Sequence, residues 1–254
     1  MDIPSTELPK PSIPYTKGWK FTAHSYVSPR PTPVTKHCCR NFEVGRNERS
    51  QFGPAERCLR NPPLPGNQGS RLLDLEILEL LKAGDSCNAQ VFTVRVDDPE
   101  YNASDANLVA KIYDPLYFDD EEGYLNPFLG VDRHYTHEVH AYGVLSDLQG
   151  VLVPRFYGSY SLDLLVGDSA KRTVRLILIE YLPGISMQQA NPKNFSQCTR
   201  QQIMTSVIQF ESEVYKRDIL LTDLHPRNVM MVDQDPQELM FCDFGGAPLW
   251  PQER

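Results

Sequence analysis

Residues 223–228 have the sequence DLHPRN, and residues 240–245 have the sequence MFCDFG. The first stretch places Asp223 and Asn228 on one predicted loop, and the second places Asp243 and a glycine after a short apolar run. Carboxylate and amide oxygens suit Mg²⁺, which in turn bridges phosphate oxygens. An aspartate that accepts a proton, together with an asparagine and an aspartate that hold cations, is the equipment of phosphoryl transfer. The two stretches therefore predict a site of that kind.

Charge is spread unevenly along the 254 residues, which are enough for one or two domains. The net charge is −8, yet residues 1–70 carry ten Lys and Arg against five Asp and Glu. The remaining residues carry fifteen against twenty-eight. An acidic body argues against nucleic-acid binding as the main activity, so no nucleic-acid partner is expected.

The six cysteines show neither CxxC pairing nor the spacing of a disulfide framework. Cys38 and Cys39 are adjacent and could oxidise, but reduced thiols are the simpler interpretation. The start of the chain lacks a basic and apolar leader, and no apolar run approaches the roughly 20 residues that span a bilayer. We expect a soluble, intracellular and cytoplasmic protein that does not contact a membrane.

Residues 1–70 contain eleven of the twenty-one prolines. Proline blocks helix interiors and removes backbone donors, so we expect this segment to be mostly extended or disordered. Its aromatic residues could dock on the folded body or bind a partner; they are Trp19, Phe21, Tyr26 and Phe42. The stretch at 29–33, with sequence PRPTP, could also present a polyproline II ligand to a protein partner.

The body begins at residue 71. Residues 90–96 and 108–113 are predicted strands that pair antiparallel across a polar loop. Residues 72–81 are apolar without a decisive period, and a turn is expected at 84–86. Residues 114–130 are predicted to form an acidic loop with aromatic residues, ahead of a helix over 131–148.

Further strands are predicted at 152–160 and 172–182, where the wholly apolar run 176–179 suits a central buried strand. Residues 197–217 predict an amphipathic helix, and residues 229–232 and 239–242 predict two short strands. The apolar stripe of the helix comprises Ile203, Val207, Phe210 and Val214. The histidines His134, His137 and His140 do not form a tight metal face at their spacing and are interpreted as surface or packing residues.

From about residue 75 to 247, the chain resembles the protein-kinase-like superfamily. The resemblance implies that Lys111, in the run Val109-Ala110-Lys111-Ile112, pairs with the α- and β-phosphates of ATP. It implies that Glu138 orients Lys111 through an ion pair and that Asp223 accepts the proton of the substrate hydroxyl. Asn228 and Asp243 match the two positions that bind Mg²⁺.

The same resemblance implies a nucleotide cleft. A degenerate glycine loop at residues 84–89 contributes Gly84 and Asn88, and the strands contribute Val91 and Ala110. The hinge is expected at residues 179–182, where backbone groups of Glu180 and Leu182 would bond adenine.

The variant DLHP is similar to small-molecule kinases of the aminoglycoside and choline phosphotransferase type. The whole combination looks most like small fungal kinase-like proteins with a proline-rich start. His225 occupies the place where many protein kinases have a lysine that touches the transferred phosphate.

Four departures from the family pattern weaken the enzymatic interpretation. The glycine loop keeps one glycine, Leu221 replaces the usual histidine, and Thr222 replaces the usual arginine or glycine. The sequence also ends nine residues after Gly245. The expected fold class is therefore α+β, a protein-kinase-like two-lobe fold with an antiparallel N-lobe sheet and a severely shortened C-lobe. The expected division is a proline-rich segment at 1–70, an N-lobe and hinge at 71–183, and a truncated C-lobe at 184–254.

Three functions remain open at this point. The first is an ATP- and Mg²⁺-dependent phosphotransferase with an unknown acceptor, in which Lys111, Asp223 and His225 are catalytic. The second is a pseudokinase, a nucleotide-binding or scaffold protein without transfer. The third is an interaction protein acting through its proline-rich start. A protein partner that covers the shortened C-lobe is also expected, because the helix at 197–217 would otherwise leave an exposed apolar patch.

Overall fold

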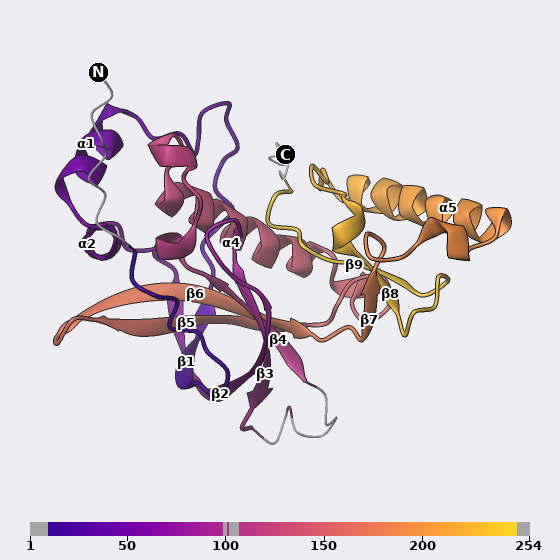
Figure 1. The fold of residues 1–254 in the computed structure, drawn as a ribbon, viewed down its shortest axis with the longest axis horizontal. Helices are drawn as coiled ribbons and strands as arrows, with labels where there is room; N and C mark the ends of the chain where they lie inside the picture. The colour runs from indigo at the N-terminus through magenta and orange to yellow at the C-terminus, as the bar shows by residue number, and fades with distance from the viewer. Residues whose placement is uncertain (1–9, 99–100, 102–106, 248–254) are drawn as a thin grey trace.

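A closed barrel of six antiparallel strands forms one end of the protein in the computed structural model, which describes residues 10–98, 101 and 107–247 (Figure 1). Around the barrel the strands follow the order β1 (Lys20–Val27), β2 (Asn67–Lys82), β3 (Gln90–Val96), β4 (Leu108–Tyr113), β6 (Ala170–Glu180) and β5 (Phe156–Val166). The antiparallel pair predicted at 90–96 and 108–113 is confirmed as β3 and β4.

Alternation along β4 decides what faces the barrel interior. Successive side chains of a strand point to opposite faces. Leu108, Ala110 and Ile112 lie in the apolar cluster inside the barrel, whereas Val109 and Tyr113 lie in a second cluster shared with the helices. The run predicted to form a central buried strand lies in β6, between β4 and β5, and all four of its side chains are buried.

The proline-rich segment requires a correction within residues 10–70, because it contains a strand and two helices. Strand β1 closes the barrel by pairing with both β2 and β5, and its Phe21, Ala23 and Tyr26 are buried. Helices α1 (Glu43–Gln51) and α2 (Pro54–Arg60) follow, the second with its proline in the first turn. Prolines at element ends are compatible with regular structure, so the proline count alone overestimated disorder.

Helix α4 (Pro127–Val144) lies across the barrel and begins four residues before the predicted start at 131 (Figure 1). The side chain of Asn126 caps it by accepting hydrogen bonds from the backbone N–H groups of Phe128 and Leu129. The predicted acidic loop before it contains the 3-10 helices η1 (Pro115–Tyr117) and η2 (Glu121–Gly123), and η3 (Ser146–Leu148) follows it.

The remaining elements lie at the other end of α4 from α1 and α2 (Figure 1). Helix α5 (Gln197–Tyr215) accompanies a small antiparallel sheet in the order β7 (Gly184–Ser186), β8 (Val229–Val232) and β9 (Leu239–Phe241). Two 3-10 helices, η4 (Pro192–Asn194) and η5 (Pro226–Asn228), complete the described part.

The apolar stripe of α5 is buried, which corrects the expectation that it forms an exposed patch. All four of its residues belong to the cluster that also contains Phe241 and Phe244. Phe210 stacks on Phe241 with ring centroids 3.8 Å apart. No helix in the described residues is both long enough and apolar enough to cross a bilayer.

Candidate active site

An ion-paired cluster joins β4, α4 and the segment after β9. The ammonium of Lys111 lies 2.7 and 2.6 Å from the two carboxylate oxygens of Glu138. It also lies 3.1 Å from Oδ1 of Asp243. Glu138 is fully buried, and Lys111 is 7 % exposed. The predicted pairing of Lys111 with the helix glutamate is therefore present in the structure, and the same ammonium contacts one of the predicted metal ligands.

The pleat of β4 explains this geometry. Lys111 shares its strand face with Tyr113, two positions away, and that face is turned toward α4. The Tyr113 hydroxyl donates to Oε2 of Glu138 at 2.5 Å. The fully buried carboxylate thus receives three hydrogen bonds, which fix α4 against the barrel.

Electrostatics keep this cluster charged. Burial alone would lower the pKa of the Lys111 ammonium, but the charges of Asp243 and Glu138 outweigh burial and raise it. The charge of Lys111 lowers the pKa of the Asp243 carboxyl despite burial. For Glu138, burial outweighs Lys111 and raises the pKa, but the three hydrogen bonds to its carboxylate favour the ionised form.

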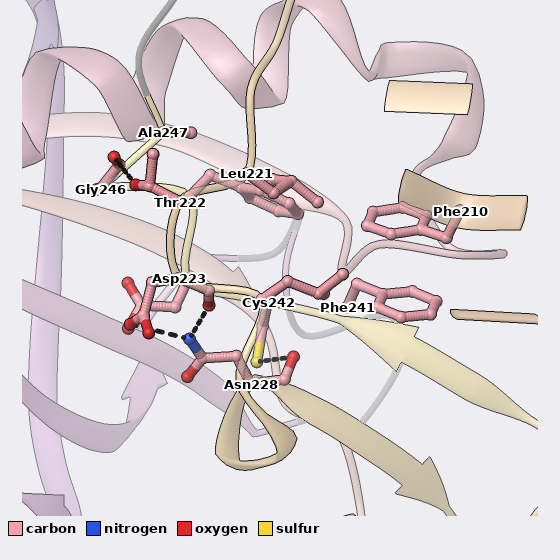
Figure 2. A pocket seen from close by; sticks show the side chains of 12 residues that line it. Phe210, Leu221, Thr222, Asp223, Asn228, Phe241, Cys242, Gly246 and Ala247 are labelled. Atoms are coloured by element: carbon pink, nitrogen blue, oxygen red, sulfur yellow. Dashed lines mark hydrogen bonds between the residues drawn. The ribbon is translucent and has the colours of Figure 1, made fainter. Parts of the chain in front are cut away.

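The loop before β8 presents Asp223 and Asn228 side by side (Figure 2). The amide nitrogen of Asn228 donates to the Asp223 backbone oxygen at 3.0 Å and to its Oδ2 at 3.4 Å. The Arg227 guanidinium lies 2.5 Å from the same Oδ2. Among the described residues, Oδ1 of Asp223 accepts no hydrogen bond, so one carboxylate oxygen is left open on a half-exposed side chain.

The segment Asp243–Gly245 turns tightly against α4. Asp243 has a φ of 70°, a left-handed conformation that is uncommon outside glycine and that concentrates at functional sites. Phe244 is buried against Tyr142 at a centroid distance of 5.4 Å. A Cβ on Gly245 would lie 3.1 Å from both Nδ1 and the backbone oxygen of His134, so the close approach explains the glycine. Burial lowers the pKa of His134 to about 4, which keeps its ring neutral there.

Residues of the two loops line one small pocket. Its volume is about 10 Å³, enough for roughly one water molecule. Asp223, Asn228 and Asp243 line it, together with the following residues: Phe210, Leu221, Thr222, Leu224, Phe241, Cys242, Phe244, Gly246 and Ala247. Leu221 packs against the neighbouring apolar cluster, in the way expected for an apolar residue in place of the usual histidine.

The donor set at this pocket fits a hard cation. Asn228 turns its amide nitrogen to Asp223, and within the described residues its Oδ1 accepts no hydrogen bond. Asp243 offers an ionised carboxylate, and Lys111 contacts its Oδ1 but not its Oδ2. No cluster of three or more His, Cys, Asp or Glu side chains suited to a metal occurs in the described parts of the chain. A Mg²⁺ ion held by Asn228 and Asp243 would therefore complete its coordination with phosphate oxygens and water.

The structure brings some of the predicted nucleotide-binding residues together and separates others. Val91 pairs directly with Lys111 across β3 and β4, so both share one face. Ala110 lies on the opposite face, in the barrel interior, and the expectation that it lines the cleft is wrong. The backbone N–H and C=O of Gly84 are both held by the side chain of Gln90, at 2.7 and 3.2 Å, and Asn88 is exposed.

The predicted hinge is partly occupied by internal bonds. The backbone N–H of Glu180 donates to the Arg155 backbone oxygen at 2.9 Å, so it is not available to adenine. Within the described residues, the backbone of Leu182 makes no hydrogen bond. His225 lies at the start of η5, where its Nδ1 accepts from the backbone N–H of Arg227 at 3.3 Å.

Sequence reasoning missed several residues that assemble this site. Tyr113 gave no signal beyond strand periodicity. The Thr222 hydroxyl donates to the Gly246 oxygen at 2.6 Å and ties the two loops together, although Thr222 was noted only as a departure (Figure 2). His137 places its ring nitrogens 2.7 Å from the Ala247 oxygen and 2.8 Å from the Thr32 oxygen. Helical spacing alone cannot reveal these carbonyl partners of His137.

Comparison with known families gives one match. The model of a family described as the ABC1 atypical kinase-like domain matches residues 165–251, which is less than half of the chain. The match spans the predicted hinge, α5, the Asp223 loop and the Asp243 turn, and it supports a place in the protein-kinase-like superfamily. Lys111 and Glu138 lie outside it. No curated protein matches the chain.

Proposed function

We propose that the protein is an ATP- and Mg²⁺-dependent phosphotransferase that acts on a hydroxyl acceptor of unidentified class. The observation that carries the proposal is the contact of the Lys111 ammonium with Asp243, which lines one pocket with Asn228 and Asp223. Three separate segments thus meet at one place. Strand β4 brings the Lys111 ammonium, the loop before β8 brings Asp223 and Asn228, and the segment after β9 brings Asp243. The kinase-like match over the loops supports the same assignment.

Each side chain has a role that its environment permits. Lys111 is held charged and would engage the phosphates of ATP beside Asp243. Asn228 and Asp243 would hold Mg²⁺, which neutralises phosphate charge when it is bound. Asp223 would accept the proton of the attacking hydroxyl at its open Oδ1, while Arg227 fixes Oδ2. His225 would contact the transferred phosphate.

The test is Mg²⁺-dependent ADP formation by the purified chain, compared with Asp223→Asn and with Asp168→Asn as a matched control. Asp168 is exposed in the turn between β5 and β6, away from the site. Loss of a positioned base lowers the rate by about 10²-fold or more, and the control should match the wild type. Equal turnover by the wild type and Asp223→Asn would reject Asp223 as the catalytic residue.

A pseudokinase that binds nucleotide without transfer is the second candidate, and specific contacts favour it. The Arg227 guanidinium lies 2.5 Å from Oδ2 of Asp223 and occupies one of its two carboxylate oxygens. The pocket beside Asp223 has a volume of only about 10 Å³. In the loop at residues 84–89, the Gln90 side chain bonds both the backbone N–H and the backbone C=O of Gly84. Phosphates could enter only if these parts moved.

Thermal unfolding with and without ATP and Mg²⁺ separates the two candidates. A ligand that binds only the folded state stabilises it by about 2.7 kcal/mol at a concentration of 100 Kd. A thermal shift without ADP formation, in the wild type and in Arg227→Ala alike, favours the pseudokinase. A shift together with turnover favours the enzyme. No shift at millimolar ATP would contradict both.

The finer expectations remain proposals. The similarity of the DLHP start to aminoglycoside and choline kinases favours a small-molecule acceptor. A partner that binds the stretch at 29–33 would have to displace it from α4, because the Thr32 backbone N–H and oxygen contact Thr136 and His137 at 3.4 and 2.8 Å.

A further inference from the structure

Two neighbouring thiols lie together on the segment that precedes α1. The sulphur atoms of Cys38 and Cys39 are 3.7 Å apart, and both side chains are partly exposed. The guanidinium of Arg133, on α4, lies 3.9 Å from the Cys38 sulphur. None of these residues belongs to the Asp223 pocket. The cluster therefore combines two thiols and one cation at an accessible position that the phosphotransfer proposal does not use.

We propose that Cys38 and Cys39 form a peroxide-reactive dithiol that closes to a disulfide between adjacent residues. The Cys38 thiolate attacks the terminal oxygen of a hydroperoxide, the O–O bond breaks, and the alkoxide or hydroxide released takes a proton from water. Cys38 becomes a sulfenic acid, oxidised by two electrons. The Cys39 sulphur then attacks the Cys38 sulphur, the S–S bond forms, and the hydroxide leaves as water with the proton of the Cys39 thiol.

The surroundings assign different roles to the two thiols. Burial acts to raise the pKa of Cys38, but hydrogen bonds at Thr35 and Cys39 and the Arg133 guanidinium outweigh it, and the pKa is lowered. Burial raises the pKa of Cys39 to about 11. A thiolate is the nucleophile in such reactions, so Cys38 attacks first and Cys39 resolves.

The other cysteines are placed differently. Burial raises the pKa of both Cys58 and Cys242 to about 12, which makes them poor nucleophiles. Cys87 is also buried, and Cys198 is exposed on α5. Cys198 therefore serves as the accessible single-thiol control.

Closure must strain the segment. Adjacent Cα atoms are about 3.8 Å apart, below the roughly 4.4 Å at which unstrained disulfides begin. A strained disulfide is more easily reduced, as a reversible modification requires.

The strained segment is attached to the start of α4. The Cys39 oxygen accepts from the backbone N–H of Asn126 at 2.8 Å, and its thiol points to the Leu129 oxygen at 3.7 Å. Asn126 caps the helix that carries Glu138. Closing the ring turns the Cys39 sulphur toward Cys38 and away from Leu129, so oxidation loosens the attachment at the first turn of α4.

The experiment treats the full chain with hydrogen peroxide and follows intact mass, thiol count and peptide mapping. The wild type should lose about 2 Da and two thiols through a bond between residues 38 and 39, and dithiothreitol should restore both. Cys39→Ser should stop at a sulfenic acid that dimedone traps. Cys38→Ser should slow oxidation of Cys39 about tenfold or more. Cys198→Ser should behave as the wild type.

Hydrogen exchange supplies an independent readout. The amide of Asn126 should exchange faster in the oxidised wild type and not in peroxide-treated Cys39→Ser. The proposal is overturned if the double variant Cys38→Ser with Cys39→Ser loses as many thiols as the wild type, or if the mapped disulfide links other cysteines.

Discussion

Asp132 offers a quantitative test of how the chain between β1 and β2 is held on α4. Its carboxylate lies on α4, is 8 % exposed, and accepts a hydrogen bond at Oδ2 from the backbone N–H of Leu64 at 3.2 Å. Burial raises the pKa of Asp132 to about 6, although the Leu64 N–H and the Arg175 charge act in the opposite direction. The carboxylate is therefore less stable in the folded protein than in the unfolded chain.

The substitution Asp132→Asn removes the charge and keeps an oxygen that can accept from Leu64. The ordinary pKa of 3.8 and the folded value of about 6 differ by about two units, which corresponds to about 3 kcal/mol at 1.36 kcal/mol per unit. Because the folded pKa is raised, the cost is fully present above pH 6 and disappears as pH falls toward the unfolded value. The variant should thus be more stable than the wild type by about 3 kcal/mol at pH 8 and by only about 0.5 kcal/mol at pH 4.

The measurement is chemical denaturation of both proteins at several pH values between 4 and 8. Comparing the two proteins at each pH cancels the titration of all groups that they share. Asp168→Asn, at an exposed turn, should stay within about 0.5 kcal/mol of the wild type throughout. A difference between Asp132→Asn and the wild type that does not change with pH, or a destabilised variant at pH 8, would refute the assignment of a burial cost to Asp132.

Two further substitutions test the site and the core beneath it. Glu138→Gln places an amide donor against the Lys111 ammonium, so it should cost about 3–5 kcal/mol in denaturant unfolding and lower ATP turnover at least about tenfold; unchanged turnover would contradict the positioning role. Phe210→Ala removes a ring stacked on Phe241 and should cost about 3–5 kcal/mol, whereas Ile208→Ala, on the exposed face of α5, should change stability by less than about 0.5 kcal/mol. Equal losses in the two α5 variants would contradict the burial of that stripe.

The residues that were predictable share one property: each belongs to a local pattern with its own chemistry. Asp223, Asn228 and Asp243 stand in two short loop motifs whose residue types suit cation and proton chemistry. Strand periodicity places Lys111 on a strand, but its role and its pairing with Glu138 came from the resemblance to the protein-kinase-like superfamily. Helical spacing alone would have left Glu138 as an ordinary solvated residue.

The residues that escaped prediction depend on long-range pairing. Strand β1 closes the barrel by pairing with the edges of both β2 and β5. These two edges lie close enough together only in the folded sheet, so the local sequence of β1 does not reveal the pairing. The resemblance placed Ala110 in the cleft beside Lys111. Adjacent residues of a strand point to opposite faces, so Ala110 lies in the barrel interior instead. Thr222 matters through one backbone oxygen, that of Gly246, and backbone acceptors leave no trace in residue identity.

Helix α4 makes the start of the chain part of the candidate site. His137 faces two carbonyl oxygens, one from Thr32 and one from Ala247, and carbonyl oxygens only accept hydrogen bonds. Two adjacent residues of α4 thus connect three parts of the chain. His137 contacts the early segment at Thr32 and the segment after Asp243 at Ala247, and Glu138 contacts the Lys111 ammonium. A movement of the early segment that displaces α4 would therefore also move Glu138, which holds the Lys111 ammonium beside Asp243.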